Sequence, residues 1–164
     1  TDVESNRRVG DLSKGMTVQL HLAVVMSIDA RLLILDEPTL GLDILFRKRF
    51  YEQLINDYFD GDRTILVSTH QVEEIQNILT HVVFMNHGQL ILHESLLDIE
   101  ERFVEVHALG EAATKAESLA YIGKRSILGG KAFIFEADAS PDLADLGELR
   151  TPSVSDLFVA KVGA

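Results

Sequence analysis

The chain has 164 residues, of which 46% are hydrophobic, so it can form one ordinary domain with room for a small second one. Its 26 acidic residues outnumber 15 lysines and arginines, and the net charge of -11 argues against general binding to nucleic acid phosphates or anionic lipid. The absence of cysteine excludes disulfides and thiolate metal sites and fits a reducing cytosol. No apolar run approaches the roughly 20 residues of a membrane helix, so any membrane role is expected to go through a partner.

The first expected element is a helix over residues 12–29. Ser13 is a good N-cap residue for it. Apolar residues follow at helical spacing: Met16, Leu20, Ala23 and Val24. Because Val18, Leu22 and Val25 widen this apolar stripe, we expect the helix to be largely buried.

Two short apolar runs are expected to form parallel strands. Leu32–Asp36 ends in a charged residue, as a central strand covered on both faces does, and Thr64–His70 is the second run. Between them, aromatic and apolar residues recur every four positions: Phe46, Phe50, Leu54 and Tyr58. This spacing predicts an amphipathic helix, and the three segments together predict a β-α-β unit.

Further along, residues 71–79 are expected to form another helix. Residues 82–93 read as two strands joined by a turn at residues 86–88. These segments complete a first domain, which we expect to span residues 1–95.

The sequence changes in texture beyond Ser95. A strand is expected over residues 103–109, followed by a helix near residues 112–121. A hairpin should turn at Gly129 and Gly130, and the end of the chain has serine caps before a helical apolar stripe. We therefore expect a small α+β accessory domain over residues 96–164.

Polar residues gather where the two predicted parallel strands end. Asp36 and Glu37 follow the first strand, and Ser68, Thr69 and His70 end the second. The carboxyl ends of parallel strands meet at one edge of a sheet, where ligands bind. There one carboxylate can hold Mg²⁺, another can polarise an attacking water, and a histidine can contact a terminal phosphate. This set suits nucleotide hydrolysis, although acids at strand ends and lone histidines are also common without such a role.

The loop before the first helix is a candidate phosphate site. Ser13 and Gly15 lie where the first free N–H groups of the helix point outward, and the positive end of the helix dipole favours anions. Gly15 also allows a ligand to come close to the backbone. In isolation this pattern is usually a simple helix cap, so its order and spacing with the other motifs decide its meaning.

Three segments form a recognisable set in this order: LSKGM at residues 12–16, LLILDEPTLGLD at 32–43 and ILVSTH at 65–70. They resemble the signature loop, the Walker B strand with D-loop, and the switch-histidine strand of an ATP-binding cassette (ABC) ATPase. The resemblance covers residues 7 to about 95, and the tail PSVSDLFVAKVG is similar to that of bacterial exporter subunits. It implies the C-terminal portion of a P-loop ABC ATPase domain, of the α/β class with a parallel β-α-β core, followed by the α+β appendage.

The resemblance assigns roles to individual positions. Asp36 would hold Mg²⁺, Glu37 would be the general base, and His70 would sense the γ-phosphate. The other positions would serve ATP bound by a facing subunit in a head-to-tail dimer: Leu12, Ser13, Lys14, Gly15 and, in the D-loop, Asp43. The implied partners are this second ABC ATPase subunit and membrane-spanning permease subunits, with no nucleic acid. The implied location is cytoplasmic, on the inner face of the plasma membrane through the permease.

Departures from the family pattern limit these expectations. Lys14 stands where glycine is most common, and Ile44 where proline usually follows the D-loop aspartate. The sequence contains no G-x-x-x-x-G-K-[ST] phosphate loop. We therefore expect the C-terminal part of a longer ATPase subunit, unable to bind or hydrolyse ATP by itself.

Other functions remain open at this stage. An ABC ATPase of a soluble machine acting on DNA or ribosomes would carry the same motifs, although the acidic charge argues against it. Residues 96–164 could instead be an interaction or regulatory module. A helicase is a weaker alternative, because it would not explain LSKGM or GLD.

Overall fold

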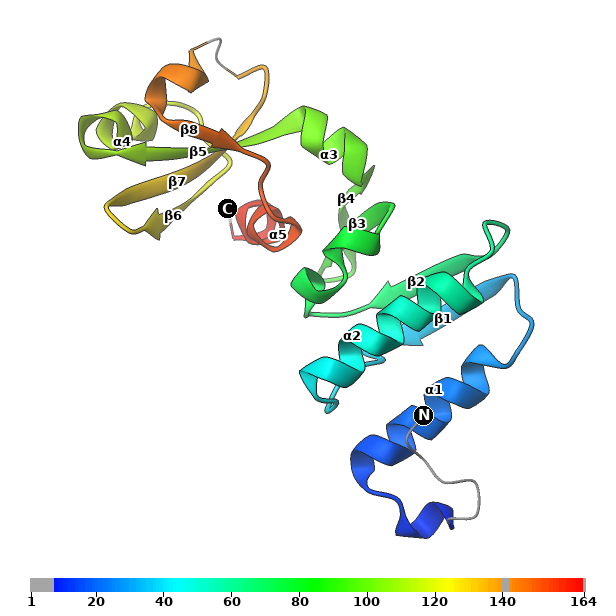
Figure 1. The fold of residues 1–164 in the computed structure, drawn as a ribbon. Helices are drawn as coiled ribbons and strands as arrows, with labels where there is room; N and C mark the ends of the chain where they lie inside the picture. The colour runs from blue at the N-terminus through cyan, green and yellow to red at the C-terminus, as the bar shows by residue number, and fades with distance from the viewer. Residues whose placement is uncertain (1–7, 140–141, 164) are drawn as a thin grey trace. The chain divides into compact units, whose positions relative to one another are not determined.

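The structure, a computed structural model, describes residues 8–139 and 142–163. The chain forms two compact units, one up to Ile75 and the other from Gln76 onward (Figure 1). The expected boundary between domains at residue 95 rests on a change in the sequence pattern and stays a prediction.

The first unit contains the predicted β-α-β segment. Its elements are η1 (Val9–Asp11), α1 (Lys14–Met26), β1 (Leu32–Asp36), α2 (Ile44–Gln53), a π-helical turn (Leu54–Tyr58), β2 (Thr64–Ser68) and η3 (Val72–Glu74). β1 and β2 pair in parallel, from Leu32 opposite Thr64 to Asp36 opposite Ser68. The predicted parallel strands are therefore confirmed, with β2 ending two residues before His70.

Burial in the first unit differs from the expectation for β1. Leu33 and Leu35 are buried, but Ile34 between them is 63% exposed, so only one face of the strand is covered. In α2 and the π-helical turn after it, residues of the predicted apolar stripe are buried, including Phe50, Leu54 and Tyr58. An apolar run cannot itself show whether one face or both faces of a strand are covered, because that depends on what packs against it.

The prediction of a largely buried first helix is wrong for this chain. α1 begins after its predicted N-cap, Ser13, but Leu22 is its buried residue and Val24 is 55% exposed. A helix that is apolar on several sides is buried only where other segments pack against each side. Residues 71–79 also differ from expectation, since they form the short 3₁₀ turns η3 and η4 (Gln76–Ile78) rather than one helix.

The second unit begins with a hairpin of β3 (His81–Asn86) and β4 (Gln89–Ser95). Its two turn residues, His87 and Gly88, both have positive φ, as a tight hairpin turn requires. The remaining elements are α3 (Leu96–Arg102), β5 (Phe103–Leu109), α4 (Gly110–Glu117), β6 (Gly123–Ile127), β7 (Gly130–Glu136), η5 (Leu143–Leu146), β8 (Glu148–Arg150) and α5 (Val154–Val162). The predicted hairpins and the predicted C-terminal helix are all present.

The four later strands form one antiparallel sheet in the order β6-β7-β5-β8. This strand order, with α4 between the first two strands in sequence, is that of a split β-α-β arrangement. Its buried core includes Val106 on β5, Phe133 and Phe135 on β7, and Ala116 on α4. Among the described residues, no helix is both long and apolar enough to cross a membrane.

α5 packs closely against the sheet at Gly123. A Cβ at this position would lie 2.4 Å from Cβ of Ala160 and 2.9 Å from its Cα, so a larger residue must displace the helix. We expect Gly123→Ala to lower the free energy of unfolding by about 1–3 kcal/mol, the usual cost of overpacking. Urea denaturation of the chain measures this. The control is Gly10→Ala, where a Cβ meets nothing within 4 Å, and an equal loss in both variants would contradict the argument.

Candidate active site

The two parallel strands bring polar residues to one edge, as their sequence order predicts. Asp36, the last residue of β1, lies opposite Ser68, the last residue of β2. The Ser68 hydroxyl donates a hydrogen bond to Oδ1 of Asp36. The Asp36 side chain is therefore oriented by the neighbouring strand and remains exposed at the edge.

Glu37 contacts the end of β2 through its backbone and its side chain. Its N–H donates to the carbonyl oxygen of Ser68 at 2.9 Å. Its Oε1 atom accepts from the His70 N–H at 3.0 Å and lies 2.7 Å from His70 Nδ1, and Oε2 accepts from the Thr69 hydroxyl at 3.3 Å. The structure thus brings together Glu37 and His70, the two residues that the sequence proposes as catalytic.

The backbone of Glu37 has φ of +44°, in the left-handed region that residues other than glycine rarely adopt. Such a conformation costs about 1–3 kcal/mol and persists where the surrounding contacts require it. The three hydrogen bonds from Thr69 and His70 supply such contacts. The sequence carries no signal for this conformation, because glutamate ordinarily avoids it.

Hydrogen bonding from His70 also affects the charge of the site. It lowers the pKa of the Glu37 carboxyl, against a smaller opposite effect of partial burial. The Glu37 side chain is 30% exposed and that of His70 is 64% exposed, so both can be reached from solvent. Glu37 is therefore a charged, accessible carboxylate at neutral pH. His70 contacts Glu37 through Nδ1, so its Nε2 takes no part in that contact.

The donor set at Asp36 fits Mg²⁺. This cation prefers oxygen ligands and is usually bound by one or two carboxylates, waters and substrate phosphates. Asp36 offers one exposed carboxylate beside the Ser68 hydroxyl. Within residues 8–139 and 142–163, no group of three or more His, Cys, Asp or Glu side chains could hold a metal ion.

The signature-like residues lie at the start of α1. Ser13 caps the helix, and its hydroxyl accepts from the Met16 N–H at 3.3 Å. Lys14 and Gly15 begin the first turn, and Leu12 closes η1 through its N–H to Val9. A Cβ on Gly15 would meet only Cδ2 of Leu42, at 4.0 Å, so the backbone is open on this side. These residues form an accessible helix N-terminus, which is compatible both with a simple cap and with phosphate binding.

Asp43 of the D-loop-like segment is the N-cap of α2. Its Oδ1 accepts from the Phe46 N–H at 3.0 Å. The preceding Thr39 is 2% exposed, and its hydroxyl lies 3.3 Å from the Tyr51 hydroxyl. Burial raises the pKa of Tyr51, so this phenol remains a neutral hydrogen-bonding group. The segment that carries Asp43 is therefore attached to α2 at both of these points.

Arg47 joins two of the motifs, a role that no local sequence pattern indicates. Its Nε donates to the Leu42 carbonyl at 2.8 Å, and its Nη1 donates to Gln71 Oε1 at 2.7 Å and to Glu74 Oε1 at 2.6 Å. It thus connects the segment before Asp43 with the segment directly after His70. From sequence alone, Arg47 belongs to the polar side of an amphipathic helix, where an arginine is ordinarily solvated.

Comparisons with known proteins place these motifs in context. A protein-family model described as "AAA domain, putative AbiEii toxin, Type IV TA system" matches residues 4–76, the range that holds Ser13, Asp36, Glu37 and His70. This match covers less than half of the chain.

Among curated proteins, a Nod factor export ATP-binding protein I from Burkholderia orbicola (strain AU 1054) is 31% identical over 87% of this chain and 48% of its own length. The protein of the same name from Rhizobium sp. (strain N33) is 28% identical over 98% of this chain and 56% of its own. The zinc uptake ATP-binding protein ZnuC from Bacillus subtilis (strain 168) is 34% identical over 51% of this chain and 36% of its own. The chain therefore spans about half the length of the relatives that it matches most fully. Over most of its length, it is a homologue of the ATP-binding proteins of ABC transporters.

Proposed function

We propose that the whole protein is the ATP-binding and ATP-hydrolysing subunit of an ABC membrane transporter. The observation that carries this proposal is the Glu37 and His70 pair at the ends of β1 and β2, with an Nδ1 to Oε1 distance of 2.7 Å. Glu37 is next in the sequence to the exposed Asp36 carboxylate, and Ser13, earlier in the chain, caps an accessible helix N-terminus. The sequence relationship to ABC transporter ATP-binding proteins supports the same conclusion.

In this proposal, Glu37 accepts a proton from the water that attacks the γ-phosphate. Its Oε1 is occupied by His70, whereas Oε2 receives only the longer bond from Thr69 and can therefore orient a water. Asp36 would hold Mg²⁺, which neutralises charge on the phosphates when bound. His70, which contacts Glu37 through Nδ1, would contact the γ-phosphate through its other ring nitrogen, and so position the base and the phosphate together.

The accessible N-terminus of α1 would act on a second nucleotide. Backbone N–H groups near Gly15 and the Ser13 hydroxyl would bind the γ-phosphate of ATP held by a facing ABC ATPase subunit, with Leu12, Lys14 and Asp43 at the same interface. Head-to-tail packing of two subunits would then complete two sites. Membrane-spanning permease subunits would be the further partners, and they would keep this subunit on the cytoplasmic face of the plasma membrane.

We infer export as the direction of transport. The two relatives whose matches extend over 87% and 98% of the chain, and so include the accessory sheet, are named for Nod factor export. The uptake protein ZnuC matches only 51% of the chain. Transport by reconstituted vesicles tests the direction: movement of substrate out of the compartment that holds ATP supports export, and movement into it contradicts export.

The first test is nucleotide binding by the 164-residue chain. Because the sequence has no phosphate loop to supply a lysine and backbone N–H groups, we expect no binding of Mg-ATP with a dissociation constant below about 1 mM. Isothermal titration calorimetry measures it, with the whole protein as the positive control. Micromolar binding by the chain alone would show that the motifs here hold ATP without a separate phosphate loop.

A further inference from the structure

Arg47 is a basic residue of α2 whose side chain is held against other segments of the first unit. It is 19% exposed, whereas the side chain of the next residue, Lys48, is 76% exposed. Its Nε donates to the Leu42 carbonyl, and its Nη1 donates to side-chain oxygens of Gln71 and Glu74, so none of these contacts lies within α2. Hydrogen bonds from a charged donor are roughly twice as strong as neutral ones. Arg47 therefore holds the segments that it contacts more firmly than a solvated arginine would.

Two of these contacts hold the two ends of the 3₁₀ turn that follows β2. Gln71 precedes the turn, and its backbone (φ -109°, ψ 56°) has no side-chain cap bond to support it. Glu74 is the last residue of the turn. Short 3₁₀ turns have poorer hydrogen-bond geometry than α-helices, so they depend more on outside contacts. Nη1 of Arg47 donates to Gln71 Oε1 at 2.7 Å and to Glu74 Oε1 at 2.6 Å, and one guanidinium thus holds both ends.

The residues directly before this turn supply the hydrogen bonds that orient the Glu37 carboxylate. The Gln71 N–H donates to the Thr69 hydroxyl at 3.0 Å, and that hydroxyl donates to Oε2 of Glu37 at 3.3 Å. His70, between these two residues, contacts Oε1 of Glu37 through its N–H and its Nδ1. A continuous series of contacts therefore leads from Arg47 to the proposed base, and every residue in it belongs to the first unit.

We propose that Arg47 is a positioning residue for ATP hydrolysis, which keeps the residues after β2 in contact with the Glu37 carboxylate. Glu37 has a left-handed backbone, a conformation that persists only where surrounding contacts require it. Without the bonds from Arg47, the segment that supplies those contacts would be free to shift. A misplacement of about 1 Å can slow a catalysed step by about 10²-fold. This inference rests on the proposed ATPase function and adds to it a residue outside the three motifs.

Two substitutions interrupt this series of contacts at different points. Arg47→Met removes the donated bonds and keeps a long unbranched side chain, and Gln71→Leu removes one acceptor without changing any charge. In the whole protein, we expect each to slow the single-turnover rate constant at saturating ATP by about five- to twentyfold, with an unchanged dissociation constant for ATP. Gln71→Leu should not slow the Arg47→Met protein further, because both act on one series of contacts. Rapid-quench measurement of phosphate gives the rate constant, which does not depend on the fraction of active protein.

Arg63 provides the matched control in the same unit. Its side chain is 22% exposed, and it donates to the Tyr58 carbonyl at 2.9 Å and to Asp29 Oδ1 at 2.8 Å. It directly precedes β2, at the opposite end of that strand from His70. Arg63→Met should therefore lower the urea midpoint about as much as Arg47→Met does, but it should hydrolyse ATP at the wild-type rate.

The outcomes separate this inference from the proposed function. Equal slowing in Arg63→Met and Arg47→Met would be a general effect of lost stability and would refute the positioning role. If Arg47→Met and Gln71→Leu both keep the wild-type rate while Glu37→Gln strongly slows hydrolysis, the role of Arg47 is refuted and the proposed function stands. If the wild-type protein itself does not hydrolyse ATP, both proposals are refuted.

Discussion

Replacing Glu37 with glutamine is expected to slow ATP hydrolysis by the whole protein by about 10²- to 10⁴-fold, the usual contribution of a general base. Glutamine keeps the shape of the side chain and can still accept a hydrogen bond from His70, but it cannot take a proton from water. ATP binding should therefore survive, and the nucleotide-bound dimer should accumulate because it no longer turns over. Phosphate release measures hydrolysis, and size-exclusion chromatography with ATP measures the dimer.

Two further variants separate this role from other effects of charge. Asp36→Asn should weaken the binding of Mg-ATP itself, since it removes the carboxylate proposed to hold the metal. Glu52→Gln removes an exposed carboxylate on α2 and should leave turnover unchanged. Turnover of Glu37→Gln within about threefold of the wild-type rate would exclude Glu37 as the base, because a lost general base costs far more.

The second large effect is expected at Gly15. Gly15→Asp should abolish ATP hydrolysis by the whole protein, because it would place a carboxylate against the γ-phosphate of the facing subunit's ATP. The fold should tolerate the change, since a Cβ at Gly15 would meet only Leu42, at 4.0 Å. Circular dichroism with phosphate release in the same preparation distinguishes loss of activity from loss of structure. If the Gly15→Asp variant hydrolysed ATP, this segment would be an ordinary helix cap and not a phosphate site.

Lys14 provides the matched comparison in the same turn. Its side chain is exposed, and the proposed phosphate contacts come from the backbone and from Ser13. Lys14→Gly, which restores the commonest residue of the family, should therefore change turnover by less than about fivefold, because an exposed charge contributes little in solvent. Ser13→Arg should block the site by its size. A large gain of activity in Lys14→Gly would instead identify LSKGM as a degenerate signature, in a subunit that hydrolyses ATP poorly.

Local sequence determined several features of this protein. Ser13, Asp43, Ser95 and Ser153 are helix caps, and His87 with Gly88 makes the hairpin turn. These features depend on hydrogen bonds and dihedral angles within three or four residues, so they can be predicted without knowing the rest of the fold. The ends of β1 and β2 were predictable for a related reason, because parallel pairing places residues that follow similar apolar runs at one edge.

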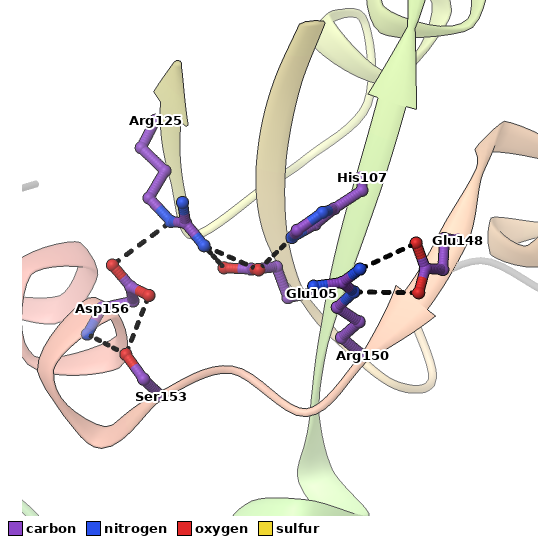
Figure 2. Close-up of polar contacts among 7 residues, drawn as sticks. All are labelled: Glu105, His107, Arg125, Glu148, Arg150, Ser153 and Asp156. Atoms are coloured by element: carbon purple, nitrogen blue, oxygen red, sulfur yellow. Dashed lines mark hydrogen bonds and ion pairs between the residues drawn. The ribbon is translucent and has the colours of Figure 1, made fainter. Parts of the chain in front are cut away.

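Tertiary structure alone decided the burial and the long-range polar contacts. In the alternating run FVEVHAL, Glu105 occupies a position that is ordinarily solvent-exposed. It is nevertheless buried, because Arg125, twenty residues later, pairs with it and His107 contacts it (Figure 2). Likewise, Arg47 contacts Gln71 and Glu74 only because the fold brings α2 beside the segment that follows β2. Glu37 adopts positive φ only because the end of β2 lies beside it. The energy of a buried charge or a strained backbone depends on partners distant in the chain, and no local pattern specifies those partners.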